Sequence, residues 1–333
     1  MSRYRRLLIG LALLAASAFA ASLLAGPTAA GSRLLSGWLG RGSAVEIEAA
    51  RIIIAEIRLP RALLGFLIGG ALGISGAALQ GYLRNPLAEP GLIGASAGGA
   101  LGAVLAIHLG LSAAFALALP LMGLVGAFAA VSVVLMLSGA RAGPLTLILG
   151  GVAVTSLAGA LTSLVLNLSD NPFAATEILF WMLGSLTDRS MTHVALAGPL
   201  VLLGTVCLLL AGRALDALSL GEDGAASLGI DLVRLRRLVV AGTALAIGAS
   251  TAVAGSISFV GLIVPHLLRS AVGQRPGRLL PASFLGGASL LLFADIAVRL
   301  ADPVDLRLGV LTALIGAPFF LWLVFKTRRE LAP

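Results

Sequence analysis

Charged residues are scarce in this sequence. Of its 333 residues, 11% are Asp, Glu, Lys or Arg and 59% are hydrophobic, whereas an ordinary soluble domain has about 25% charged residues. So few charges could not cover a surface that faces water, and most of the surface must therefore face lipid. The 42 glycines agree with this interpretation, because small residues let helices pack closely inside a membrane.

Lysine is almost absent, and this excludes a P-loop ATP site. Such a loop needs the pattern G-x-x-x-x-G-K-[ST], and the only lysine, Lys326, follows Phe325. If ATP and Mg²⁺ drive this protein, a partner subunit must bind them. We therefore expect no nucleotide cofactor in this chain.

Residues that could form a metal or catalytic site are equally sparse. Cys207 is the only cysteine and lies in an apolar run, so it offers neither a disulfide nor a Cys-based metal site. The three histidines lie far apart, without metal-ligand spacing: His108, His193 and His266. The G-A-S-A-G run at 94–98 opens an apolar segment, and we interpret it as a helix start rather than a nucleophile elbow. We expect no metal site, no catalytic residue and no enzyme activity.

Basic residues outnumber acidic ones, 23 to 15, and such an excess is also found in nucleic-acid-binding proteins. Here the arginines lie between apolar runs, and no surface of alternating aromatic and basic residues is visible. We therefore expect no nucleic-acid partner. Arginines in the loops of a membrane protein determine its orientation instead.

Apolar segments long enough to span a bilayer, or nearly so, recur along the whole chain. They predict an all-α, polytopic membrane protein with about ten transmembrane helices, in which residues 1–333 form a single domain. The eighth segment is short and contains Pro265 and His266. The segments lie at 7–25, 61–82, 92–110, 113–138, 144–168, 191–212, 238–257, 258–272, 280–299 and 308–325.

The distribution of basic residues predicts the orientation. With ten crossings both termini lie on the same side, and placing them in the cytoplasm puts 15 of the basic residues inside and 8 outside. Basic loops favour the cytoplasm, so we expect both termini on the cytoplasmic side of the membrane. The eight outer residues are Arg33, Arg41, Arg51, Arg58, Arg61, Arg189, Arg299 and Arg307.

Three connections are longer than a simple turn. The outer connection before the second span contains 44–57, which has the pattern of an amphipathic helix on the membrane face. Another outer stretch, 169–186, predicts a re-entrant or surface helix. The cytoplasmic connection 213–237 can form two short helices separated by Gly221 and Gly229, with acidic residues at one helix start.

A weak internal repeat is also visible. Residues 58–61 read RLPR and residues 234–237 read RLRR, and each opens a glycine-rich apolar helix. The two helices start on opposite sides in the predicted orientation, as in the inverted repeats of transporters. Chance similarity between glycine-rich helices is the alternative.

Ion-coupled secondary transport is the rival function. Such transporters place ionisable residues in the middle of the membrane, whereas the predicted helix centres here are almost free of charge. Asp295 is the deepest candidate, and Arg299 lies one helical turn away, where it can neutralise Asp295. This pattern speaks against proton or sodium coupling.

Several long motifs resemble those of the FecCD family of ABC-importer permeases, whose members transport ferric siderophores, haem or cobalamin. The resemblance covers nearly the whole chain. The motifs are RLPRALLGFLIGGALGISGAALQGYLRNPLAEPGLIGASAGG (58–99), FWMLGSL (180–186), LSLGEDGAASLGI (218–230), GSISFVGLIVPHLLR (255–269), FADIAVRL (293–300) and GVLTALIGAPFFLWL (309–323).

The resemblance implies the architecture of a type II ABC importer. The permease forms a homodimer, two ATP-binding subunits attach on the cytoplasmic side, and a periplasmic substrate-binding protein docks outside. Substrate would move by ATP-driven alternating access. Among the substrates of the family we favour haem or a ferric siderophore over cobalamin, because the outer arginines suit an anionic ligand.

The resemblance also assigns residues to three sites. Cytoplasmic gating falls on Asn85 and Pro86, although proline there also suits a plain turn. Docking of the binding protein falls on Arg58, Arg61 and Arg299, for which snorkelling to the membrane interface is the alternative. Coupling to the ATPase falls on the 213–237 connection, which could instead be a solvated linker; its residues are Leu218, Gly221, Glu222, Ala225, Ala226 and Gly229.

Overall fold

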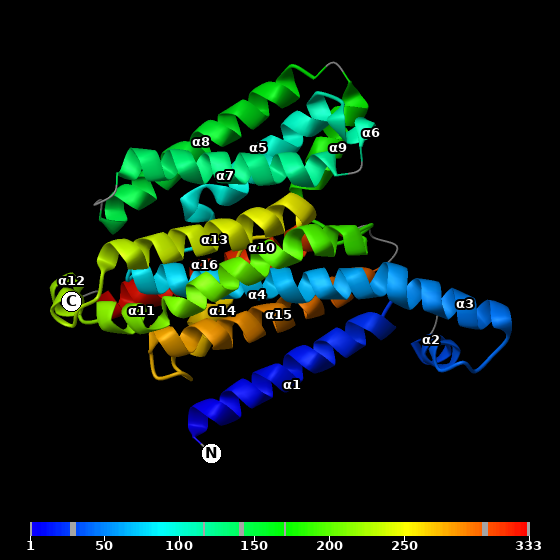
Figure 1. The fold of residues 1–333 in the computed structure, drawn as a ribbon, viewed down its shortest axis with the longest axis horizontal. Helices are drawn as coiled ribbons and strands as arrows, with labels where there is room; N and C mark the ends of the chain where they lie inside the picture. The colour runs from blue at the N-terminus through cyan, green and yellow to red at the C-terminus, as the bar shows by residue number, and fades with distance from the viewer. Residues whose placement is uncertain are drawn as a thin grey trace.

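The computed structural model describes residues 2–26, 31–115, 117–139, 143–169, 171–301 and 306–331. These residues form a bundle of helices without a strand (Figure 1). The ten predicted segments all appear as helices: α1 (Arg3–Leu24), α4 (Leu59–Tyr82), α5 (Ala95–His108), α7 (Ala118–Ser138), α8 (Pro144–Asn167), α10 (Met191–Leu210), α13 (Leu232–Ala254), α14 (Val260–Arg269), α15 (Pro276–Leu300) and α16 (Leu308–Leu331).

Eight of these helices are long and apolar enough to cross a membrane. The exceptions are α5 with 14 residues and α14 with 10 residues. At 1.5 Å per residue they measure about 21 Å and about 15 Å, less than the roughly 30 Å of a hydrocarbon core. Each is preceded by an irregular segment, so helix and segment together make one crossing.

Short helices lie mostly at the two ends of the bundle. We name the ends after α12 and α9, which lie at opposite ends in Figure 1. The short elements are α2 (Gly31–Trp38), α3 (Ala44–Ile52), the π-helical turn η1 (Ile53–Arg58), the 3₁₀ turn η2 (Pro90–Ile93), α6 (Leu111–Ala114), α9 (Pro172–Met182), α11 (Gly212–Leu218) and α12 (Glu222–Ser227).

The centre of the bundle is formed by α4, α13 and α15. In the most hydrophobic stretch of α4, 83% of the residues are buried, and the value for α13 is 78%. Glycines let α4 and α15 approach each other backbone to backbone, because a Cβ at Gly73 would lie only 2.0 Å from the Ser283 carbonyl oxygen. This close approach is typical of membrane helices, whose association depends on packing.

The predicted amphipathic helix at 44–57 forms, but it is not a separate surface element. α3 continues through η1 into α4, so the helical path runs unbroken from Ala44 to Tyr82. A capping box between Ser43 and Glu46 begins it, and α2 packs on it through Leu34, Ala50 and Ile54. The predicted helix within 169–186 is α9, with 11 residues.

Candidate functional site

Two irregular segments meet inside the bundle. Residues 83–94 return from the α12 end before α5 begins, and residues 255–259 return from the α9 end before α14 begins. A Cβ at Gly76 would lie 1.8 Å from the Gly261 carbonyl oxygen, so the first turn of α14 touches the interior of α4. Non-helical backbone at membrane depth occurs where protein buries it or where it lines a water-filled path.

The arrangement of these segments has inverted symmetry. α4 and α13 run in opposite directions through the bundle (Figure 1), and each is followed by an irregular segment and a short helix. The short helices α5 and α14 therefore both begin inside the bundle. Half-helices that begin at the membrane midplane are typical of transporter sites, which gives the weak sequence repeat a structural counterpart.

Glu89 joins the two irregular segments. Its carboxylate accepts a hydrogen bond of 2.7 Å from the backbone N–H of Phe259, the residue before α14. Phe259 has a left-handed backbone (φ 66°), which turns its N–H toward the carboxylate. A negative charge at a helix N-terminus is stabilised by the helix dipole, so Glu89 fixes the start of α14 to the segment that follows α4.

Gln80 on α4 supports the same junction. Its side-chain N–H donates to the carbonyl oxygens of Ala88 and Gly261, each at 3.4 Å. Its side-chain oxygen accepts a hydrogen bond of 2.5 Å from the Arg269 guanidinium at the end of α14. These bonds tie the 83–94 segment and both ends of α14 to one side of α4.

Sequence reasoning missed Glu89 because the Glu89-Pro90-Gly91 run reads as a turn outside the membrane. The structure places it instead at the start of η2, beside α14. No sequence signal pointed to it, because the predicted segment 92–110 was long enough to cross a bilayer by itself, and the 14-residue length of α5 is known only from the structure.

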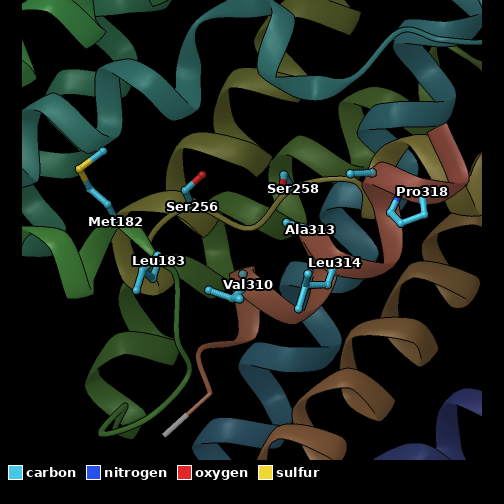
Figure 2. A pocket seen from close by; sticks show the side chains of 10 residues that line it. Met182, Leu183, Ser256, Ser258, Val310, Ala313, Leu314 and Pro318 are labelled. Atoms are coloured by element: carbon cyan, nitrogen blue, oxygen red, sulfur yellow. The ribbon is translucent and has the colours of Figure 1, made fainter. Parts of the chain in front are cut away.

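An open cavity lies beside this junction, along the half of α16 nearer the α9 end (Figure 2). Its volume is about 560 Å³, and its walls come from the end of α9, the 255–259 segment and α16. The lining is almost entirely apolar, with two hydroxyl groups. The residues that face it include Met182, Leu183, Ser256, Ser258, Leu314 and Pro318.

An arginine lies just before α16, next to this region. The Arg307 guanidinium lies 5.0 Å from the centre of the Phe180 ring on α9, in a cation–π contact. Both α16 and α9 also line the cavity. Arg307 precedes the lining residue Gly309 by two positions, so the described part of the chain places a cationic residue near one end of this apolar wall.

The predicted coupling segment folds as expected. α11 and α12 are two short helices, and Gly221 and Gly229 both have positive φ, 99° and 78°. Leu218 and Ala225 are buried against the protein, whereas Glu222, Ala226 and Gly229 are exposed.

Two leucines that the sequence did not single out flank α12. Leu220 is 70% exposed and Leu228 is 63% exposed. Two exposed leucines beside a short helix at the end of the bundle form an apolar contact surface. A hydrogen bond of 2.7 Å from the Gly277 N–H to the Asp216 carboxylate attaches α11 to α15.

The predicted gate residues lie at the α12 end, in the turn that follows α4. The Asn85 side-chain oxygen accepts a hydrogen bond of 2.9 Å from the Leu87 N–H, and Asn85 and Pro86 are exposed. Only two residues separate Pro86 from Glu89. The turn is therefore linked by a short stretch of chain to the intramembrane junction, while its role as a gate stays a prediction.

The three predicted docking arginines form one cluster near the α9 end. Arg61 makes a bidentate contact with Asp295 at 2.8 to 3.0 Å, and Arg299 contacts the same carboxylate at 3.2 Å. Asp295 is 1% exposed. The Asp295–Arg299 pair expected from the sequence is therefore present, with Arg61 as an additional partner.

Arg58 and Arg299 also hold the end of α1. The Arg58 guanidinium donates to the Leu23 carbonyl oxygen at 3.0 Å, and Arg299 donates to the Ser22 and Ala25 carbonyl oxygens at 2.9 Å. The last carbonyls of a helix lack partners within the helix and carry partial negative charge. The cluster thus has an internal structural role, and docking of a partner there stays a prediction.

The fold and this junction define a class: a polytopic helical permease whose membrane path contains broken helices. Comparison of the sequence with protein families identifies the family. The profile of the FecCD transport family matches residues 8–326, and the chain belongs to this family. It is a multi-pass inner-membrane permease subunit of ABC transporters, a family in which the ATPase is a separate subunit.

Named relatives agree with this assignment. The chain is 37% identical to the vitamin B12 import system permease protein BtuC of Klebsiella pneumoniae over 98% of this chain and 95% of that protein. It is 38% identical to the hemin transport system permease protein HmuU of Yersinia pestis over 83% and 84% of the two chains. A solved structure described as an inward-facing metal-chelate type ABC transporter matches with a TM-score of 0.84 and 34% identity, over 97% and 99% of the chains.

Proposed function

We propose that two copies of this chain form the pathway of an ATP-driven importer for an anionic metal chelate. Haem or a ferric siderophore is favoured and cobalamin is possible. The observation that carries the proposal is the open cavity on α16 beside the intramembrane junction of Glu89 and Phe259. A second copy facing α16 would close the cavity into a central path.

An apolar wall with few hydrogen-bonding groups suits transport of a large ligand. Tight binding inside the path would slow release, and the cavity offers only the hydroxyl groups of Ser256 and Ser258 beside apolar side chains. Arg307 near the cavity would attract an anionic chelate without surrounding it. The binding protein supplies the selectivity before transfer.

In this proposal the α12 end is cytoplasmic and the α9 end is periplasmic. Each ATP-binding subunit attaches to the surface formed by α12, Leu220 and Leu228. Its ATP-driven movement reaches α15 through the bond between Asp216 and Gly277, and α15 in turn contacts α14 and α16. The residues 140–142, which follow α7, lie outside the described part of the chain.

Docking of the binding protein is proposed at the opposite end, above the arginine cluster. Three arginines and one aspartate leave a net charge of about +2 there, which favours encounter with an acidic partner. Because the guanidinium groups are bonded internally, long-range attraction is their expected contribution. An ion-coupled secondary transporter, the rival raised by the sequence, gains no support from membership of a family with a separate ATPase.

A transport assay in proteoliposomes with the partner subunits tests the proposal. Ala317→Trp fills the cavity from an exposed position on α16 and should abolish chelate uptake. Ile315→Trp adds the same side chain at an exposed position on α16 that does not line the cavity and should leave uptake unchanged. Equal uptake by the two variants would contradict the assignment of the pathway to the cavity on α16.

A further inference from the structure

A groove lies between α7 and α13 at the α12 end of the bundle. Its volume is about 520 Å³, and both helices reach this end at the left of Figure 1. α7 contributes Leu135, Met136 and its C-terminal residue Gly139; α13 contributes Val233, Arg236, Arg237, Val240 and Ala241. Met136 is 73% exposed, so the groove opens to the surroundings of the bundle.

Polarity changes along the groove in the way that it changes across a bilayer surface. Arg236 and Arg237 lie in the second turn of α13, beside the end of α7 at Gly139. Val240 and Ala241 lie one turn farther into the membrane. The basic end is therefore at the level of lipid headgroups, and the apolar end is at the level of acyl chains.

The two arginines differ in how they are held. Arg236 is 5% exposed, and its guanidinium donates a hydrogen bond of 2.5 Å to the Gly139 carbonyl oxygen. Arg237 is exposed, and within the described ranges no hydrogen bond or ion pair involves its side chain. Among the described residues that line the groove none is acidic, and the carboxylate of Asp231 nearby accepts the Arg234 N–H at the start of α13.

We propose that this groove binds an anionic phospholipid. The lipid phosphate pairs with the Arg237 guanidinium in the positive field of Arg236, and one acyl chain lies along Met136, Val240 and Ala241. Basic pockets between membrane helices bind anionic headgroups in this way, and arginine matches phosphate bidentately. That the lipid belongs to the cytoplasmic leaflet rests on the orientation given under the proposed function.

Other occupants fit the groove less well. A free phosphate ion would gain nothing from the apolar floor. A second copy of the chain would bring two pairs of arginines together across a symmetric interface, where like charges repel. If the arginines served only to determine membrane orientation, they would not need a groove. Arg234 is the control for this alternative, because it is exposed on the same helix but lies outside the groove.

Native mass spectrometry of the full chain in mild detergent tests the site. The protein is mixed with phosphatidylglycerol or phosphatidylcholine of identical acyl chains, and the retained lipid is counted. We expect preferential retention of phosphatidylglycerol. Arg237→Gln should weaken it about fivefold, which corresponds to roughly 1 kcal/mol for one basic residue at an anionic membrane surface. Arg234→Gln should retain as much as the native chain.

Two further experiments distinguish lipid binding in the groove from attraction by charge alone. Ala241→Trp fills the apolar part without changing charge and should also reduce retention, whereas excess inorganic phosphate should not displace the lipid. Equal loss in Arg234→Gln and Arg237→Gln would show diffuse attraction and overturn the site. Equal retention of the two lipids, or displacement by inorganic phosphate, would also overturn it.

Cross-linking tests whether a second copy of the chain covers the groove. Met136→Cys is combined with Cys207→Ser, which removes the only native cysteine. A disulfide between two copies at position 136 would show that the groove is an interface and would overturn the lipid site; the absence of a cross-link supports it. Chelate uptake by the native chain is measured in parallel, so that equal retention of the two lipids together with intact uptake contradicts this inference alone.

Discussion

The pair α4 and α13 differs sharply from the pair α8 and α16. In the most hydrophobic stretches of the first pair, 83% and 78% of residues are buried, against 28% and 22% in the second. α4 packs on α14 and α15 through glycines at backbone distance, and α16 borders an open cavity. Because low local burial lowers the cost of movement, the molecule separates into a fixed scaffold and helices free to shift or to meet a second copy.

The largest effect is expected at the charge cluster of the scaffold. Asp295→Ala leaves Arg61 and Arg299 without their shared carboxylate. Breaking a buried pair from one side costs about 3–5 kcal/mol. Thermal unfolding of the chain in detergent, without any binding protein, should therefore shift strongly downward.

Glu177→Ala, on the exposed surface of α9, is the control and should not shift the transition. If Asp295→Ala unfolds like the native chain, the cluster does not hold α1 and α4 together. The arginines would then be left with docking as their role.

The next effect concerns backbone packing. Gly76→Ala places a Cβ 1.8 Å from the Gly261 carbonyl oxygen, and α4 and α14 must separate. Overpacking of this kind costs about 3 kcal/mol. Gly159→Ala on α8 meets nothing within 4 Å and should be neutral. Comparable unfolding temperatures for both variants would contradict the division of the molecule into a fixed scaffold and mobile helices.

A substitution of Glu89 tests the junction between the 83–94 segment and the start of α14. Glu89→Gln keeps a hydrogen-bond acceptor for the Phe259 N–H but removes the charge that makes the bond strong, a difference of about 1 kcal/mol. We expect a small change in unfolding and a clear loss of chelate uptake, because the start of α14 is held more weakly. Glu177→Gln is the matched control, and uptake at the native rate in both variants would remove Glu89 from the mechanism.

In the coupling segment the main effect is expected on association with the ATPase rather than on folding. Gly221→Val and Gly229→Val force a side chain into a left-handed backbone, at a cost of about 1–2 kcal/mol each. The chain should still insert into the membrane, while association with the ATPase, measured by co-purification, should fall. Gly143→Val, at a glycine with negative φ and open surroundings, should associate normally. If all three variants associate with the ATPase like the native chain, α12 has no role in coupling.

Much of the fold could be predicted because lipid imposes a simple pattern. Each long apolar segment became a helix, and the glycines of 213–237 marked the ends of α11 and α12. The Asp295–Arg299 pair followed from helical spacing alone. These are local features, and local features are visible in a sequence.

The rest depends on contacts between distant segments. Arg299 meets Ser22 across 277 residues, and Glu89 meets Phe259 across 170, and neither spacing has a periodic signal. Nor could the sequence show that the predicted docking arginines would find internal acceptors. The cavity on α16 arises from the way in which α9 and the 255–259 segment pack, so no single motif encodes it.

The claim that the transport pathway runs along α16 is tested most directly by measuring the access of water to this helix. In a chain with Cys207→Ser, Ala317→Cys is treated in proteoliposomes with a membrane-impermeant maleimide, and labelling is compared with Leu202→Cys on the exposed face of α10. Maleimide reacts with the thiolate, which forms in water and not in lipid. We predict rapid labelling at position 317 and almost none at position 202. Equally slow labelling at both positions would place α16 against lipid and contradict a pathway there.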